Sequence, residues 1–244
     1  MSFEDATYDG DVFNGKRHGK GKLVGAGGET YEGDFAAGYR HGRGKLTLPS
    51  GTVIVGAFQG DMVHGRALMV SANGERYSGE FRHNDFHGEG TYEFADGGSY
   101  TGEWRDGMMH GKGKYVHDDA GDEYEGEYVE DEKHGFGVYR SDDDAVYEGE
   151  WRHGQMHGHG KHTDSKGGVY TGEWADGKRH GAGRWEGEHG EVAEGTWAHG
   201  ERTKDVRVIV EGRPPPSVDD VIASYMGSAA APAPAPAASG STAA

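Results

Sequence analysis

Large hydrophobic residues, most of them aromatic, recur along this chain at a fixed spacing, with glycine and charged residues between them. Most steps between successive marker tyrosines are 23 residues, and Ile54 stands midway through one step of 46. The markers are Tyr8, Tyr31, Tyr77, Tyr100, Tyr124, Tyr147 and Tyr170. A fixed period of about 20–50 residues is typical of repeat architectures. The sequence therefore predicts eight repeats from Tyr8 to about residue 192. A partial ninth repeat follows around Trp197 and has Ala193 in place of the tyrosine.

Each repeat is predicted to form a β-hairpin. With the tyrosine as position 0, Tyr, Gly and an aromatic residue stand at positions 0, 2 and 4, a period of two that places them on one face of a strand. Glycines at positions 11 and 13 and a mostly large residue at 15 share one face of the next strand. The Gly-x-x-His-Gly segment between the strands predicts a turn. A second turn joins the repeats, as at Ser50-Gly51, Asn73-Gly74 and Asp96-Gly97.

The predicted fold is therefore all-β: one elongated, single-layer antiparallel meander of about eight to nine hairpins. About 17 strands spaced by roughly 4.8 Å would give a rod about 80 Å long. The glycines have a packing reason, because a neighbouring residue without a Cβ lets an aromatic ring lie against the backbone. A single layer leaves this aromatic face three options: it curls on itself, stays partly exposed or is covered by a partner.

The opposite face is predicted to carry two complementary rows of charge. Positions 1 and 3 are acidic in most repeats, as at Asp9, Glu32, Asp34 and Glu103, and positions 12 and 14 are often basic. The basic residues are Lys20, Lys22, Arg43, Lys45, Arg66, Lys112, Lys114, Lys161 and Arg184. Antiparallel pairing sets these rows opposite each other, and a slip of one residue would move the charges onto the aromatic face.

The repeat pattern Tyr-x-Gly-x-aromatic-x-x-Gly-x-x-His-Gly-x-Gly resembles the MORN (membrane occupation and recognition nexus) repeat, over residues 8 to about 203. The first repeat departs from it at Val12, the third at Ile54, Asp61 and Ala67, and the sixth at Asp131. The resemblance implies a twisted, grooved single sheet. It also implies a short MORN protein without other domains, similar to subunits of radial spoke heads and related axonemal complexes.

Composition narrows the functional classes. The 244 residues include 46 glycines and no cysteine, so neither a disulfide framework nor a thiolate metal site is expected. The net charge of −17 opposes nucleic acid and, in bulk, anionic lipid. No segment reads as a membrane helix or a signal peptide, which predicts a soluble protein of the cytoplasm. The resemblance to MORN proteins implies a location in the cytoskeleton.

No candidate catalytic, cofactor or metal site emerges from the sequence. Eight histidines recur once per repeat, about 10 Å apart if two strands separate them, too far for several to bind one metal ion. They are expected to form turns, with ring nitrogens bonded to nearby backbone or acids. The acidic clusters at 118–123 and 142–144 do not have the spacing of a calcium loop, and the Gly-Lys pairs lack the Ser or Thr of a phosphate-binding loop. The chain is therefore expected not to be an enzyme.

The expected organisation is a lead-in at residues 1–7, the repeat array at 8–205, a C-terminal segment at 206–226 and a disordered Ala/Pro-rich tail at 227–244. The C-terminal segment combines a closing strand at 206–210, a proline linker and a short amphipathic helix. The helix places five side chains on one stripe: Val218, Val221, Ile222, Tyr225 and Met226. It would dock either on its own sheet or on a partner or second copy.

Two interpretations of function follow. The first is a scaffold that binds other proteins, or a second copy of itself, through the C-terminal helix stripe or the aromatic face, and the resemblance implies that these proteins belong to a cytoskeletal, ciliary axonemal assembly. The candidate face is Tyr77, Phe81, Tyr100, Trp104, Tyr124, Tyr128, Tyr147, Trp151, Tyr170 and Trp174. The alternative, which the name of the family suggests, is a membrane tether that binds phosphoinositide through basic residues near the two ends. These are Lys16, Arg17, Lys20, Lys22, Lys178, Arg179 and Arg184.

Overall fold

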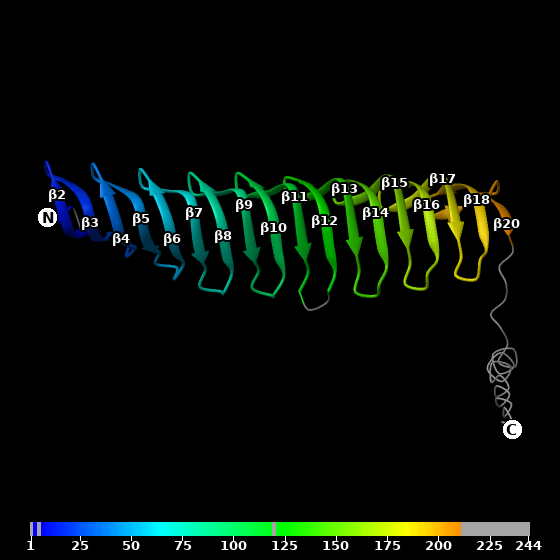
Figure 1. Ribbon diagram of the computed structural model, residues 1–244, viewed down its shortest axis with the longest axis horizontal. Coiled ribbons are helices and arrows are strands. Elements are labelled where there is room, and N and C mark those ends of the chain that lie inside the picture. The colour runs from blue at the N-terminus through cyan, green and yellow to red at the C-terminus, as the bar shows by residue number, and fades with distance from the viewer. Residues whose placement is uncertain (1, 4–5, 119–120, 211–244) are drawn as a thin grey trace, which may run out of the picture.

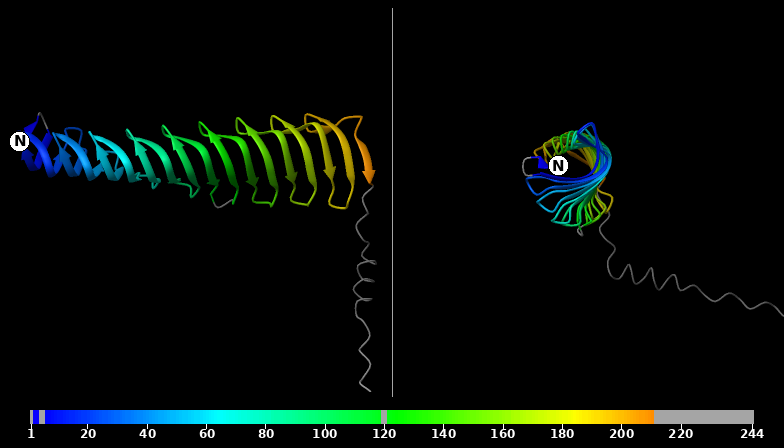
Figure 2. Two further views of the ribbon diagram at one scale, coloured as in Figure 1. Left: turned by 45° about the horizontal axis from the view of Figure 1, so that its top comes forward. Right: turned by 90° about the vertical axis from the view of Figure 1, so that its left-hand side faces the viewer.

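The protein is one long antiparallel sheet. The computed structural model describes residues 2–3, 6–118 and 121–210, and the twenty strands in this part of the chain belong to a single sheet. From β1 to β18 each strand pairs with the next one in the chain, so the predicted meander of hairpins is confirmed. The strands stand side by side along a long axis (Figure 1). Viewed down that axis, the sheet curls around it (Figure 2).

The first half of the array contains β1 (Ser2–Phe3), β2 (Ala6–Phe13), β3 (Lys16–Val24), β4 (Thr30–Ala36), β5 (Tyr39–Thr47), β6 (Val53–Gln59), β7 (Met62–Val70), β8 (Arg76–Arg82), β9 (Asp85–Glu93) and β10 (Ser99–Arg105). The second half contains β11 (Met108–Val116), β12 (Glu123–Val129), β13 (Glu132–Arg140), β14 (Val146–Arg152), β15 (Gln155–Thr163), β16 (Val169–Ala175), β17 (Lys178–Glu186), β18 (Val192–Ala198), β19 (Glu201–Arg202) and β20 (Arg207–Val210).

The hairpin turn is tighter than the sequence predicts. In the fifth repeat it consists of Asp106 and Gly107, both with positive φ, which fits a type I′ turn and the twist of the strands. The Gly-x-x-His-Gly prediction is wrong for the histidine, because His110 lies in β11 and pairs with Glu103. The register then skips Gly111 and Lys112, which form a bulge, and resumes where Gly102 faces Gly113. Gly111 has the positive φ that this bulge requires.

The hairpin turns also fasten neighbouring repeats together. The amide of Gly107 donates to the carbonyl of Phe86 in the preceding repeat, at 3.0 Å. Three repeats replace this glycine by Asp or Asn, residues that tolerate a positive φ. Their side-chain oxygens each accept an additional hydrogen bond, at 2.7–2.8 Å, from a backbone amide of the preceding repeat. Asp61 accepts from Arg40, Asn84 from Val63 and Asp131 from Met109. The departures at Asp61 and Asp131 therefore add a hydrogen bond between repeats.

The core of seven repeats is a tyrosine ring lying on bare glycine backbone, as predicted. Tyr100 is fully buried, and a Cβ built on Gly113 would overlap its phenol ring. The Tyr100 hydroxyl donates to the carbonyl of Glu103 at 3.0 Å. The same hydroxyl-to-carbonyl bond is present in seven repeats, at 2.8–3.2 Å.

Two repeats without the tyrosine fill its place in another way. In the third repeat Ile54 stands at the tyrosine position, and Ala67 replaces the glycine that the ring would have covered. A Cβ on Gly56 would overlap that of Ala67. In the ninth repeat Ala193 replaces the tyrosine, and Val206 packs close to Gly195. Loss of the ring is thus matched by a larger residue at the glycine position.

The C-terminal edge completes a ninth hairpin. β18 pairs with β19 at Trp197 and Ala198, and with β20 from Val192 to Glu194. The closing strand predicted for 206–210 is confirmed as β20, which begins one residue later, at Arg207. The predicted proline linker, the helix with Val218, Val221, Ile222, Tyr225 and Met226, and the tail at 227–244 lie outside the described residues.

Candidate interaction surfaces of the sheet

The predicted aromatic face is a buried spine of rings. All ten candidate residues, from Tyr77 to Trp174, are at most 7% exposed. Each of the five marker tyrosines in this set meets the aromatic residue four positions later edge-on, as Tyr100 meets Trp104 at 5.0 Å between ring centroids. It meets the corresponding ring of the next repeat in the same way, as Tyr100 meets Tyr128 at 5.2 Å. The rings therefore pack among themselves, and a direct contact with a partner stays a prediction.

Side chains at position 9 of the repeats cover this spine. Arg40 lies 5.8 Å from the ring centre of Tyr31, and Arg179 lies 5.4 Å from that of Tyr170. The Lys133 ammonium lies 4.6–5.1 Å from the rings of Tyr124, Tyr139 and Trp151. The middle repeats use apolar residues here, among them Phe86 and Met109, which pack on the buried rings. The residues that a partner would meet on this side are therefore the variable ones at position 9 and the half-buried row at position 15.

Burial sets the protonation of the groups on this side. It raises the pKa of Tyr31 and Tyr170 to about 12. Burial likewise raises the pKa values of Tyr77, Tyr100, Tyr124 and Tyr147. Burial lowers the pKa of the Lys133 ammonium. The tyrosine hydroxyls are therefore neutral hydrogen-bond donors to the backbone across the ordinary pH range.

The charged rows lie opposite each other across the strands, as predicted. Lys22 faces both Asp9 and Glu32, and Lys114 faces Glu125. Several pairs are close enough to interact directly. The nitrogen–oxygen distances are 2.6 Å for Lys20 and Asp34, 2.7 Å for Lys114 and Glu123, 4.0 Å for Arg66 and Glu80, and 2.7 Å for Arg184 and Glu194.

The acids at position 3 have a second role that the sequence did not reveal. The carboxylate of Glu103 accepts a hydrogen bond at 2.9 Å from the amide of Lys112, inside the bulge. Six repeats share this bond, at 2.9–3.3 Å, between Asp11 and Lys20, Asp34 and Arg43, Glu103 and Lys112, Glu127 and Phe136, Glu150 and His159, and Glu173 and Ala182. The carboxylate thus satisfies a backbone donor that the bulge removes from the ladder.

The third repeat interrupts the acidic rows. Its positions 1 and 3 hold Val55 and Ala57 instead of carboxylates. Across the β5–β6 pairing Lys45 therefore faces Val55, and Arg43 faces Ala57. Val55 is 47% exposed. Among the described residues, no carboxylate oxygen lies within 4.0 Å of the Arg43 or Lys45 side-chain nitrogens.

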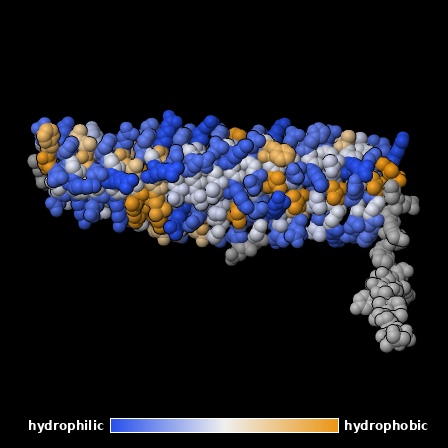
Figure 3. Space-filling view, in the orientation of Figure 1, coloured by the Kyte–Doolittle hydropathy of each residue, from blue (hydrophilic) through white to orange (hydrophobic). Residues whose placement is uncertain are grey.

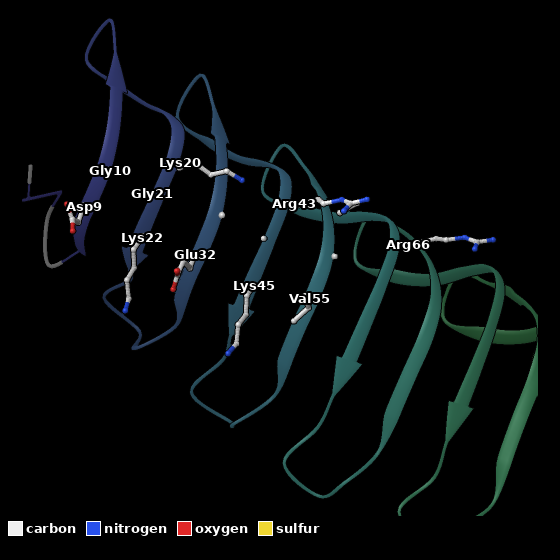
Figure 4. Close-up of a pocket in the computed structure, with 14 residues that line it drawn as sticks. Asp9, Gly10, Lys20, Gly21, Lys22, Glu32, Arg43, Lys45, Val55 and Arg66 are labelled. Carbon is white, nitrogen blue, oxygen red and sulfur yellow. The ribbon is translucent and has the colours of Figure 1, made fainter.

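This interruption lies in a groove on the charged face of the sheet, with a volume of about 1030 Å³. We call it the N-terminal groove. It is lined by Asp9, Gly10, Lys20, Gly21, Lys22, Glu32, Gly33, Arg43, Gly44, Lys45, Val55, Gly56, Ala57 and Arg66. Lys20, Arg43 and Arg66 lie along one side, and Lys22 and Lys45 along the other (Figure 4). Sequence reasoning did not single out this site, although the missing acids at residues 55 and 57 were its signal.

The structure divides the seven basic residues of the lipid-binding alternative. Arg17 and Arg179 are position-9 residues over the rings of Phe35 and Tyr170. Arg184 is paired with Glu186 and Glu194, and Lys20 with Asp34. The basic residues therefore do not form a continuous cationic patch at either end of the sheet. One end has Lys16, Arg17, Lys20 and Lys22, and the other has Lys178, Arg179 and Arg184. Lipid binding by them stays a prediction.

Within residues 2–3, 6–118 and 121–210, no three His, Asp or Glu side chains are placed to hold a metal ion. The same part of the chain contains no helix long and apolar enough to cross a membrane. Hydrophilic residues dominate the face seen in Figure 3, and apolar residues appear there as separate spots.

Comparison with known proteins supports the repeat assignment. The MORN repeat model matches residues 8–30, 31–53, 77–99, 100–119, 124–146, 147–169 and 170–188, and so omits the third repeat. No curated protein matches the chain.

Among solved structures, the TCP10 domain of Danio rerio CPAP aligns with a TM-score of 0.44 and 12% identity, over 80% of this chain and 92% of that one. The TCP domain of Drosophila melanogaster SAS-4, solved with a proline-rich motif of Ana2, aligns with a TM-score of 0.29 and 12% identity, over 72% and 77%. Since seven repeats match over more than half of its length, the chain belongs to the MORN repeat family.

Proposed function

We propose that this protein is a non-enzymatic scaffold that holds other proteins along a rigid rod. The observation that carries the proposal is the continuity of the sheet. Backbone pairing runs from β1 to β18, and the edge-to-face ring contacts continue from repeat to repeat, as from Tyr124 to Trp151 and from Tyr147 to Trp174. Such an array keeps surface groups at fixed intervals over its whole length.

The rod offers three kinds of attachment. Its edge strands carry unpaired backbone groups that can accept a strand, and the exposed Val208 and Ile209 lie on β20 at one edge. The charged face presents ordered rows of acids and bases. The C-terminal helix predicted for residues 217–226 would add a third. The proposed partners are proteins of a cytoskeletal assembly or a second copy of this chain.

We further propose, from the resemblance alone, that this assembly is ciliary and axonemal, with radial spoke heads as the first place to look. Affinity purification of the tagged full chain from ciliated cells tests this, compared with a chain that ends at residue 213. The expected result is a reproducible set of axonemal proteins with the full chain. A set without cytoskeletal proteins would overturn the axonemal assignment, and recovery of no protein at all would overturn the scaffold. An unchanged set without residues 214–244 would exclude the helix as the attachment.

A membrane tether that binds phosphoinositide is the second candidate, favoured by the cationic N-terminal groove. The net charge of −17 opposes it, and one Lys or Arg near an anionic membrane contributes only about 1 kcal/mol. Flotation with vesicles that contain phosphatidylinositol 4,5-bisphosphate, against vesicles of phosphatidylcholine alone, separates the two functions. Salt-sensitive flotation with the first vesicles only would favour the tether.

A further inference from the structure

We propose that the N-terminal groove binds an extended acidic segment of a partner protein that also carries apolar side chains. This inference rests on the proposed scaffold function and assigns it a site. The third repeat differs from the others because neither position 1 (Val55) nor position 3 (Ala57) holds an acid.

The first property is a pair of cations, Arg43 and Lys45, that face no acid across the β5–β6 pairing. In the neighbouring repeats the basic residue at position 12 faces an acid, as Lys20 faces Asp34 and Arg66 faces Glu80. Arg43 faces Ala57 instead, and Lys45 faces Val55 on one side and Glu32 on the other. A ligand carboxylate would supply the charge that the third repeat lacks, as a charge-assisted hydrogen bond to Arg43 or Lys45.

The second property is the distribution of charge along the chain. Residues 1–70 contain eight acidic and eight basic residues, so the entire net charge of −17 lies in residues 71–244. Of the 14 lining residues, five are basic and only Asp9 and Glu32 are acidic. The groove is therefore a local cationic site at the neutral end of an acidic rod, and it favours an acidic ligand over the rest of the surface.

The third property is apolar surface placed among the cations. Val55 is 47% exposed and faces Leu68 across the β6–β7 pairing. Ala57, the other substituted position, lines the groove as well. A ligand side chain that covered Val55 would bury apolar area and shield the adjacent ion pairs from water. This combination selects a segment with both acidic and apolar residues.

The fourth property is the spacing of the cations. Lys20, Arg43 and Arg66 recur every two strands, about 9.6 Å apart along the sheet. Three residues of a polyproline II segment span about 9.3 Å. An extended segment with an acid at every third residue would therefore meet successive cations in register. A flat membrane surface would gain little from such a row, since the rest of the rod repels it.

Fluorescence anisotropy tests this with the full chain and a labelled peptide of five Glu-Pro-Val repeats. Matched peptides carry Gln-Pro-Val and Lys-Pro-Val. We expect salt-sensitive binding of the Glu peptide, at least tenfold tighter than that of the other two. Equal binding of the Glu and Gln peptides would overturn the proposal.

The decisive variant is the double substitution V55E/A57E, which restores the acids that other repeats carry at these positions. It should weaken the binding of the Glu peptide at least tenfold and leave the temperature of thermal unfolding unchanged. The matched control T101E/T171E adds two equal charges at position 1 of the fifth and eighth repeats and should bind like the natural chain. Unchanged binding by V55E/A57E would overturn the groove assignment. So would phosphoinositide vesicle binding that this variant abolishes while the peptide fails to bind.

The same variant separates this inference from the scaffold function. If V55E/A57E recovers the same cellular proteins as the natural chain, the groove proposal fails while the scaffold stands. If the natural chain recovers no protein, the scaffold itself fails. Loss of a subset of partners by V55E/A57E alone, together with the loss of Glu peptide binding, would support both.

Discussion

The phenol ring of Tyr100 lies directly on Gly113, in the space that a Cβ on that glycine would occupy. The same contact joins Tyr8 to Gly21, Tyr31 to Gly44, Tyr77 to Gly90, Tyr124 to Gly137, Tyr147 to Gly160 and Tyr170 to Gly183. Glycine normally weakens a strand. Here it lets a large ring approach the backbone, and the fold depends on repeating that approach.

The hydroxyl of this tyrosine should contribute less than its ring. Tyr100→Phe removes the bond to the Glu103 carbonyl and keeps the ring on Gly113. We expect a loss of about 1 kcal/mol in the free energy of unfolding, measured by chemical denaturation followed by circular dichroism. Phe substitution at the exposed Tyr39 is the control and should have a smaller effect. An equal loss in the two variants would contradict the role given to the hydroxyl.

The stability of the bulge should depend more on a hydrogen-bond acceptor at position 3 than on the charge of that acceptor. Glu103→Ala removes the acceptor of the Lys112 amide, whereas Glu103→Gln keeps an oxygen in place. We expect Ala to lower the free energy of unfolding by about 1 kcal/mol and Gln to cost less than half of that. The two variants are compared by thermal unfolding at low and high salt. A Gln variant as unstable as the Ala variant would show that charge pairing is the main role of this carboxylate.

Alkaline pH should unfold the protein through its buried tyrosines. Burial raises the pKa values of Tyr31 and Tyr170 to about 12, against about 10 in an unfolded chain. Above pH 10 the unfolded chain releases these protons and the folded chain retains them. The stabilisation is therefore complete below pH 10 and is lost as the pH rises from 10 to 12.

Spectrophotometric titration at 295 nm measures this directly. Most of the 13 tyrosines should ionise late and together with unfolding, and all should ionise near pH 10 in guanidinium chloride. A native titration curve that coincides with the denatured one would contradict the burial of the tyrosine row.

The features that were predictable from sequence are those in which the same type of residue recurs at the same position from repeat to repeat. The two-residue period at Tyr100, Gly102 and Trp104 identified the ring face, and the acid and base rows fixed the register. The bulge was not predictable, because Gly111 looks like a turn glycine until its positive φ is known. The role of the position-9 side chains, which lie over the rings, was also not predicted. This position holds Arg, Val, Phe, Met or Lys, so the repeats have no common residue type there.

The N-terminal groove was missed for a different reason. The substitutions at Ile54, Asp61 and Ala67 were visible as departures from the pattern, but Val55 and Ala57 sit at positions where no single residue is required. Their importance depends on which residues face them. Only the pairing of β5 with β6 shows that Arg43 and Lys45 are the cations left without an acid there.

The contact between ring and glycine is tested most directly by a double-mutant cycle on Tyr100 and Gly113. Gly113→Ala alone should destabilise by about 1–3 kcal/mol, because its methyl group overlaps the Tyr100 ring. The control is Gly27→Ala, in a loop where only the flexible Glu29 side chain is near. It should lower the free energy of unfolding by about 0.5 kcal/mol or less.

The double variant Tyr100→Ile/Gly113→Ala reproduces the Ile54–Ala67 pair that the third repeat already uses. The two single variants of the cycle are Tyr100→Ile and Gly113→Ala. If the rings occupy the space above the glycines, the double variant will lose at least 1 kcal/mol less free energy of unfolding than the two single variants lose in total. Strict additivity of the two losses would contradict the account.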